Sequence, residues 1–212
     1  THFQAWNEGG GSDIIIKGRA LFLIKKYGKR DMRVLDSGSG NGLFAEKIFK
    51  EGFRTIAGID IDDYREDKRK KFFQDFKKSD LNTEIFPWPD DSFDVVTAWQ
   101  VIEHLENPHH FIREAYRVLK KDGLFFISMP NIFHIFNKLI FLKSGDMPRW
   151  REKNDHITLF PKGIFNKTVL KYFTLLERGF CKGEFPYRFL KKFSFPENEL
   201  FGKSIYYVLK KK

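Results

Sequence analysis

Three glycines at alternate positions, Gly38, Gly40 and Gly42, follow a short apolar stretch that ends in Asp36. Glycine allows the backbone to take positive φ angles and to approach a ligand closely. A helical pattern begins at Leu43, and the first turn of a helix leaves backbone N–H groups without partners inside the helix. Strand, glycine turn and helix together predict a nucleotide-binding unit, although such a turn is by itself also compatible with a purely structural role.

A second acid, Asp60, lies 20 residues beyond Gly40 and ends the next apolar stretch. A carboxylate at this distance can accept the protons of both ribose hydroxyls of a nucleoside held over the glycine turn. The glycine spacing is G-x-G-x-G, whereas dinucleotide sites have G-x-G-x-x-G, and Asp36 would repel a pyrophosphate. The pattern therefore favours S-adenosylmethionine, a cationic nucleoside without phosphate, over NAD.

The elements that must position these residues alternate between apolar strands and amphipathic helices. This alternation predicts an α/β fold, a three-layer sheet with mostly parallel strands and helices on both faces. The expected helices cover residues 12–27, 43–51, 64–78, 109–120 and 162–178, with Gly179 as the end of the last. The expected strands are one at Val34 and Leu35, then 54–60, a short one ending at Asp80, 93–99, 124–128, 180–185 and 204–209.

Polar residues follow five of these expected strands at the point where each strand ends. They are Asp36, then Asp60 with Asp62, then Asp80, the run from Gln100 to His104, and Pro130 with Asn131. In an open α/β sheet, ligands bind beyond the carboxyl ends of the strands, where the strand order reverses. We therefore expect these side chains to surround one ligand site.

The composition indicates a single globular domain of 212 residues. Within it we expect an N-terminal arm and helix over residues 1–28 and an inserted, lid-like segment over residues 131–154. The only cysteine, Cys181, excludes an intramolecular disulfide and a cysteine-based zinc site, which fits a cytoplasmic protein. The net charge of +10 raises the possibility of an anionic partner, but the lysines are scattered at expected helix and chain ends.

Six motifs resemble, in order and spacing, those of class I S-adenosylmethionine-dependent methyltransferases. The motifs run over residues 34–42, 58–60, 87–96, 101–105, 111–119 and 128–131. They are most similar to the small-molecule branch that includes ubiquinone-biosynthesis-type O-methyltransferases. The resemblance implies a Rossmann-like sheet of seven strands whose last strand, 204–209, is antiparallel to the rest.

The resemblance also implies a role for each matching residue. Gly38 and Gly40 would pass under the methionine part, and Asp60 would bind the ribose. Asp80 and Leu81 would border the adenine, and Trp99 and Gln100 would lie beside the sulfonium. The complete expected cofactor set is Asp36, Gly38, Ser39, Gly40, Gly42, Asp60, Ile61, Asp80, Leu81, Trp99 and Gln100.

Methyl transfer is an in-line displacement, so a general base is needed only when the acceptor is a neutral hydroxyl or a protonated amine. The candidates for such a base are His104 and His156, and for each a merely packed histidine is the alternative. Some ubiquinone-pathway relatives are thought to hold a metal with a Glu-x-x-Glu-His motif. This chain has Gln100 in place of the first glutamate, so we expect no metal.

The sequence favours a small-molecule or carrier-linked acceptor that is methylated at oxygen. Residues 131–154 mix apolar and basic side chains, which suits a lid over an aromatic, lipid-linked or acidic acceptor and is compatible with a homodimer. A nucleic-acid methyltransferase is the first alternative, but the Asn/Asp-Pro-Pro-aromatic tetrapeptide expected after the fourth strand is replaced by Trp99-Gln-Val-Ile102. A non-catalytic S-adenosylmethionine-binding protein is the second. We expect neither nucleic-acid binding nor stable membrane insertion.

Overall fold

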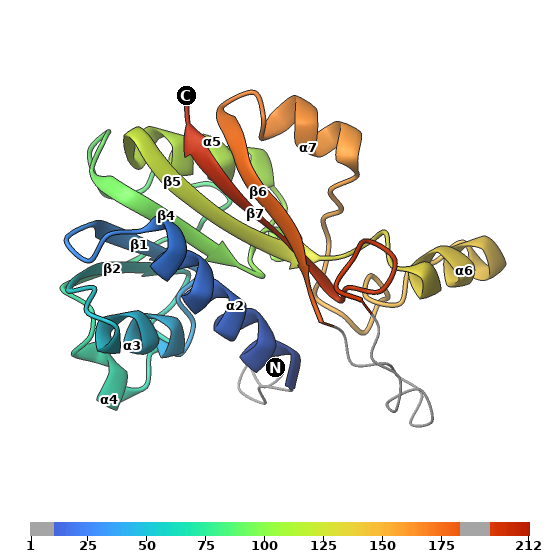
Figure 1. Ribbon diagram of the computed structural model, residues 1–212, viewed down its shortest axis with the longest axis horizontal. Coiled ribbons are helices and arrows are strands. Elements are labelled where there is room, and N and C mark those ends of the chain that lie inside the picture. The colour runs from blue at the N-terminus through green and yellow to red at the C-terminus, as the bar shows by residue number, and fades with distance from the viewer. Residues whose placement is uncertain (1–10, 183–195) are drawn as a thin grey trace.

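The computed structural model describes residues 11–182 and 196–212 and contains a seven-stranded sheet with the order β3-β2-β1-β4-β5-β7-β6 (Figure 1). The strands are β1 (Arg33–Ser37), β2 (Thr55–Asp60), β3 (Asp75–Lys78), β4 (Phe93–Trp99), β5 (Leu119–Pro130), β6 (Phe173–Cys181) and β7 (Ser204–Lys211). The helices are α2 (Gly11–Tyr27), α3 (Leu43–Lys50), α4 (Asp67–Lys70), α5 (Pro108–Val118), α6 (Ile135–Ser144) and α7 (Lys162–Thr168), with a 3₁₀ turn, η1 (Ile102–His104).

The strand order reverses beside β1, which pairs in parallel with both β2 and β4. The chain builds β1, β2 and β3 towards one edge and then returns to place β4 on the other side of β1. The carboxyl ends of β1 and β4 therefore form the crevice in which open α/β sheets bind ligands. The last strand, β7, is antiparallel to β5, so the expected seven-stranded Rossmann-like fold is confirmed.

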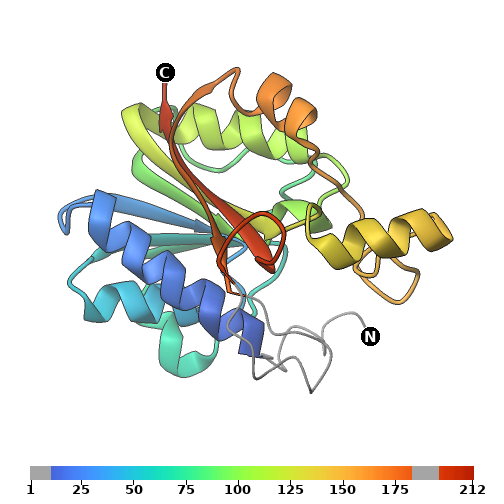
Figure 2. The same ribbon diagram turned by 45° about the vertical axis from the view of Figure 1, so that its right-hand side comes forward.

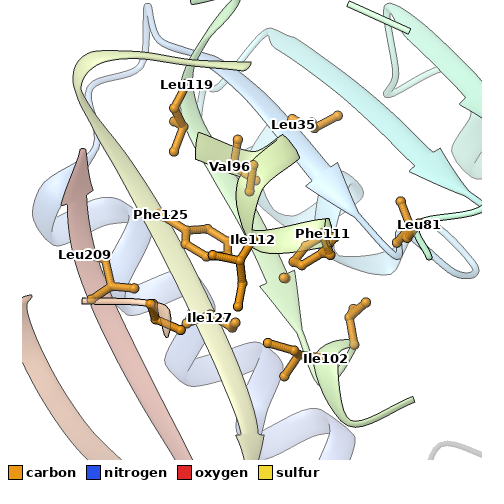
Figure 3. Close-up of a cluster of buried hydrophobic side chains, with 14 of the residues drawn as sticks. Leu35, Leu81, Val96, Ile102, Phe111, Ile112, Leu119, Phe125, Ile127 and Leu209 are labelled. Carbon is orange, nitrogen blue, oxygen red and sulfur yellow. The ribbon is translucent and has the colours of Figure 1, made fainter. Parts of the chain in front are cut away.

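Side chains that alternate along the central strands form two hydrophobic cores, one on each face of the sheet. On β5, Phe125 and Ile127 enter the core beneath α5, whereas Phe126 enters the core beneath α2 and α3. Figure 3 shows the first core, in which Phe111 and Ile112 of α5 meet Val96, Phe125 and Ile127 from the sheet. Helices thus cover both faces of the sheet (Figures 1 and 2), as a buried parallel sheet requires.

The expected helix over residues 64–78 is wrong. Only Asp67–Lys70 is helical, and Asp75–Lys78 forms β3, which pairs with Ala57–Asp60 of β2. The expected short strand is therefore present, but it ends at Lys78 and lies inside the segment assigned to the helix. Phe73 and Phe76 pack over Gly58, where an added Cβ would lie 2.7 Å from the Phe73 ring. The edge of β2 that does not pair with β1 therefore pairs with the strand β3, and these residues do not form the expected helix.

The expected helix over residues 162–178 is also too long, because α7 ends at Thr168 and β6 begins at Phe173. Gly179 lies inside β6, where a Cβ would lie 2.3 Å from the Tyr206 hydroxyl oxygen, and so does not end a helix. Long-range pairing of β6 with β7 overrides the helical spacing of the apolar residues. The remainder of the expected strand over 180–185, and most of the loop that follows, lie outside the described residues.

The remaining elements match the expected ones apart from their ends. The strand β5 is longer than the expected 124–128 because its first residues turn around Asp122 (φ 62°) before Leu124 joins β4. The expected arm before the first helix lies outside the described residues. Within the described ranges, no helix has both the length and the apolarity needed to cross a membrane.

Candidate cofactor site and histidine cluster

The glycine turn between β1 and α3 is held against the end of β2 by backbone hydrogen bonds. Gly38, Gly40 and Gly42 all have positive φ, at 68°, 50° and 79°. The Gly38 nitrogen donates to the Ile59 oxygen at 2.9 Å, and the Gly42 nitrogen donates to the Ser39 oxygen at 3.0 Å. The three glycines therefore occupy conformations that other residues rarely adopt.

The Asp60 carboxylate connects the glycine turn to β2. Its Oδ2 accepts the Gly40 N–H at 2.8 Å, and its Oδ1 accepts the Ile61 N–H at 2.8 Å. Burial raises the pKa of Asp60 to about 6, and the two backbone donors oppose that shift. Each carboxylate oxygen keeps a second lone pair, so the group can still accept ribose hydroxyl protons.

Two buried serine hydroxyls near this turn support a polar ligand. Ser39 Oγ and Ser79 Oγ have no hydrogen-bond partner within the described parts of the chain. The Ser79 backbone nitrogen donates to the backbone carbonyl oxygen of Asp60 at 2.9 Å. Ser39 lies between Gly38 and Gly40, so the two serines adjoin Asp60 and the glycine turn. Ile61, which follows Asp60 in the chain, is 60% exposed, so its side chain is accessible to a nucleoside. These residues fit a bound S-adenosylmethionine.

The Asp36 side chain is buried at the end of β1 and accepts the Thr97 hydroxyl of β4 at 3.0 Å. Residues 34–36 of β1 pair with residues 95–97 of β4, so this bond lies at the strand pair where the order reverses. A buried carboxylate at this crevice favours a cationic ligand. The position of Asp36 therefore agrees with a sulfonium or ammonium group nearby.

Asp80 and Leu81 lie just beyond β3, but the Asp80 carboxylate is engaged by its own turn. Its oxygens accept the Asn82 N–H at 2.9 Å and the Thr83 hydroxyl at 2.9 Å. Burial opposes ionisation of Asp80, but these hydrogen bonds outweigh it and hold its pKa below the usual value. Leu81 belongs to the core that contains Ile59. Asp80 thus shapes the turn that would border an adenine.

Trp99 is the last residue of β4, and Gln100 begins the turn that leads into η1. Gln100 has a φ of 56°, a conformation that is uncommon for residues other than glycine and that concentrates at functional sites. Its side-chain nitrogen donates to Ser128 Oγ at 3.1 Å, which ties the end of β4 to β5. The Trp99 ring packs edge-on against Phe44 with centroids 5.8 Å apart. This turn lies against the glycine turn, because a Cβ on Gly38 would meet Val101.

The structure brings the two candidate histidines together, although 52 positions separate them in the sequence. The His104 and His156 ring centroids lie 4.7 Å apart, and the Trp150 ring lies 5.5 Å from His156. The Ile157 and Thr158 backbone nitrogens both donate to the backbone carbonyl oxygen of Glu103, which fixes the segment carrying His156 against η1. Burial and the neighbouring His104 lower the pKa of His156 to about 4, so its ring is neutral at pH 7.

Glu103, which was not among the expected catalytic or cofactor-binding residues, is the third member of this cluster. Its side chain is 1% exposed, and neither carboxyl oxygen has a hydrogen-bond partner among the residues described. Burial raises the pKa of Glu103 to about 8, and the charge of Arg149 opposes that shift. The Glu103-His104 pair is visible in the sequence, but the burial of Glu103 depends on the tertiary structure and is not predicted by a local pattern.

Donor atoms of Glu103, His104 and His156 all lie within 4.8 Å of one another, close enough to surround one cation. The Glu-x-x-Glu-His set does not form, because Gln100 Nε2 bonds Ser128 and Gln100 Oε1 accepts the Ser204 hydroxyl at 3.4 Å. The expectation that no metal is bound remains a prediction.

Alanine at Gly38 is expected to weaken cofactor binding by about tenfold or more, because its Cβ would lie 2.5 Å from Val101 Cγ2. The positive φ adds about 1–2 kcal/mol of strain for a residue with a Cβ. Calorimetry with S-adenosylhomocysteine measures the affinity. The matched control is Gly163→Ala in α7, where nothing lies within 4 Å of the added Cβ. Equal affinities for the two variants would contradict a close approach of the turn to the cofactor.

Known proteins resemble this chain in sequence and in fold. The family described as "Methyltransferase domain" matches residues 14–171. A probable S-adenosylmethionine-dependent methyltransferase of Mycolicibacterium smegmatis is 36% identical over 98 residues, which cover 46% of this chain and 38% of that protein. A ubiquinone biosynthesis O-methyltransferase of Glaesserella parasuis is 27% identical over 167 residues, covering 62% of this chain and 67% of the relative.

Solved structures share the fold. A SAM-dependent methyltransferase from Archaeoglobus fulgidus superposes with a TM-score of 0.63 at 24% identity, covering 94% of each chain. The chain spans between about a third and two thirds of the length of the first curated relatives that it matches. The family match covers more than half of the chain. The chain therefore belongs to the methyltransferase-domain family, and the expected class I S-adenosylmethionine-dependent methyltransferase fold and cofactor are confirmed.

Proposed function

We propose that the protein transfers a methyl group from S-adenosylmethionine to a hydroxyl oxygen of a small or carrier-linked acceptor. The observation that carries this proposal is the convergence of His104 and His156 beside the turn that follows β4. Val101 in that turn packs against the Gly38 position, which connects the histidine cluster to the glycine turn. An acceptor between them would therefore face both the cofactor and an imidazole.

The residues around this position favour a flat acceptor that carries a hydroxyl group. Trp150 and the two histidine rings supply aromatic surfaces. His156 Nδ1 is buried and has no hydrogen-bond partner in the described ranges, which supports a role for this atom in accepting a proton from a bound ligand. A neutral imidazole can take the hydroxyl proton as the oxygen attacks the methyl carbon opposite the sulfur. The ubiquinone biosynthesis O-methyltransferase relative supports oxygen as the methylated atom.

The test is transfer of a tritiated methyl group from S-adenosylmethionine to a panel of phenols, sugar alcohols, carboxylates, amines and RNA. We expect label in the hydroxyl-bearing acceptors together with release of S-adenosylhomocysteine. Label in RNA alone would contradict the proposal and support the nucleic-acid alternative. Tight binding of S-adenosylhomocysteine with no transfer to any acceptor would support a non-catalytic binding protein.

A further inference from the structure

Arg149 is a half-buried arginine in the segment that connects α6 to His156. The residue after it, Trp150, is anchored twice. Its backbone nitrogen donates to the carbonyl oxygen of Met147 at 2.9 Å, and its ring nitrogen Nε1 donates to the carbonyl oxygen of Thr158 at 3.1 Å. Because Trp150 is fixed at both its backbone and its ring, the backbone that carries Arg149 is also held against the segment of His156.

The Arg149 guanidinium is close enough to the histidine cluster to act on it electrostatically, but it bonds to none of its members. Burial lowers the pKa of both His134 and His156, and the positive charge of Arg149 adds to both effects. Across residues 11–182 and 196–212, the guanidinium makes no hydrogen bond and no ion pair. Both carboxyl oxygens of Glu103 likewise lack a partner there. A half-buried group with five N–H donors therefore has its hydrogen bonds left to a ligand.

Arg149 is also the charged side chain of this region that a ligand can reach. Glu103 is 1% exposed, whereas part of the Arg149 surface is open. Among the described residues, Arg149 is the only lysine or arginine whose charge affects the pKa of Glu103, His134 or His156. One fixed positive charge matches a singly charged carboxylate better than a phosphate, which carries nearly two charges. The planar guanidinium can bond both oxygens of a carboxylate at once.

We propose that Arg149 binds a carboxylate group of the acceptor and thereby selects hydroxy acids as substrates. This inference rests on the proposed function, because it takes the acceptor to lie between the glycine turn and the histidine cluster. The guanidinium would hold the carboxylate end, while the rings of Trp150 and His156 contact the flat part of the molecule. Two separate points of attachment fix the orientation of the acceptor, so that one hydroxyl faces the methyl carbon.

A purely structural role for Arg149, which is to balance the charge of Glu103, explains the geometry less well. An arginine that compensates a buried acid is expected to bond it, because an unbonded pair leaves both groups without their hydrogen bonds. Neither oxygen of Glu103 has such a bond. The two roles also differ in their consequences. A structural role affects all acceptors equally, whereas a binding role affects only acceptors that carry a carboxylate.

The first test measures binding without methyl transfer. Isothermal titration calorimetry on the protein loaded with S-adenosylhomocysteine compares para-hydroxyphenylacetate with para-ethylphenol, in which a methyl group replaces the carboxylate. We expect the carboxylate to bind more tightly by about tenfold or more. The R149Q variant should remove this difference. The R149K variant should restore only part of it, since an ammonium group cannot form the two parallel bonds of a guanidinium.

The second test is kinetic and uses R151Q as the matched control, because Arg151 lies two positions further on and pairs with Asp146 at 3.1 Å. With para-hydroxyphenylacetate as acceptor, R149Q should raise KM by about tenfold or more and leave kcat nearly unchanged, since the contact is the same in the ground state and the transition state. R151Q should change neither constant.

Equal affinities of the unchanged protein for the two probes, including no binding of either, would overturn the proposal. An equal loss of both probes in R149Q would assign Arg149 a structural role. Tighter binding of para-hydroxyphenyl phosphate than of the carboxylate would overturn the choice of a carboxylate. Binding of the carboxylate that depends on Arg149, without methyl transfer to any hydroxyl, would support this inference and contradict the proposed function alone.

Discussion

Replacing Asp60 by alanine is expected to lower the affinity for S-adenosylhomocysteine by at least about a hundredfold. The variant loses the acceptor of both ribose hydroxyl protons, and a hydrogen bond to a charged group contributes about 1.5–3 kcal/mol. It also removes the partner of the Gly40 N–H, which Asp60 Oδ2 accepts at 2.8 Å. Isothermal titration calorimetry measures the loss, and thermal unfolding checks that the fold is retained.

The matched control for Asp60 is Asp62→Ala. Asp62 lies two positions further on, and its ion pair with Lys78 lowers its pKa below the usual value. Asp62 was expected among the polar residues around the ligand, but it bonds outward to Lys78 and not to the glycine turn. Its removal should therefore leave cofactor affinity unchanged. Undiminished affinity of the Asp60→Ala variant would exclude the proposed ribose contact.

The raised pKa of Asp60 adds a second readout of the same contact. Ribose hydroxyls donate to the ionised carboxylate, so affinity should rise with pH, about tenfold per unit, until it levels off near pH 6. The contribution of Asp60 to folding stability has the opposite pH dependence. Because the pKa of Asp60 in the folded state lies above its usual value of 3.8, the folded state binds more protons than the unfolded state. The contribution of Asp60 to stability therefore falls as pH rises between about 4 and 6. The Asp60→Ala variant should lack this pH dependence of binding.

Replacing His156 by alanine is expected to lower the rate of methyl transfer by about a hundredfold or more while changing cofactor affinity by less than about threefold. Its ring lies 4.7 Å from His104 and 5.5 Å from Trp150, in the cluster that borders the turn after β4. The glycine turn and Asp60 do not depend on it. Single-turnover transfer measures the rate, and calorimetry with S-adenosylhomocysteine measures the affinity.

The control for His156 is His109→Ala, an exposed histidine that packs on Phe160 with ring centroids 6.1 Å apart. This variant should transfer methyl groups at the normal rate. A normal rate for His156→Ala would remove His156 as the base. A chelator that lowers the rate of the unchanged protein to the level of His156→Ala would show that the cluster of Glu103, His104 and His156 acts through a bound metal.

Local pattern predicted the parts of the fold whose contacts are close in sequence. The glycine turn, Asp60 and the buried strand β4 were expected from spacing alone, because the ligand geometry of a strand-turn-helix unit depends on a few neighbouring residues. The two wrong helices, at residues 64–78 and 162–178, have apolar residues at helical spacing. Their strands form because β2 and β7 offer unpaired edges, and such pairing depends on distant residues.

The sequence by itself predicted the candidate nucleoside site, since Asp36, Gly38, Gly40 and Asp60 lie within 25 consecutive residues and one β-α-β unit holds them. Only the tertiary structure decided the histidine cluster. Backbone hydrogen bonds from Ile157 and Thr158 to Glu103 bring residues more than 50 positions apart into contact. The same packing removes Glu103 from water and raises its pKa, which is a property of its surroundings and not of its place in a motif.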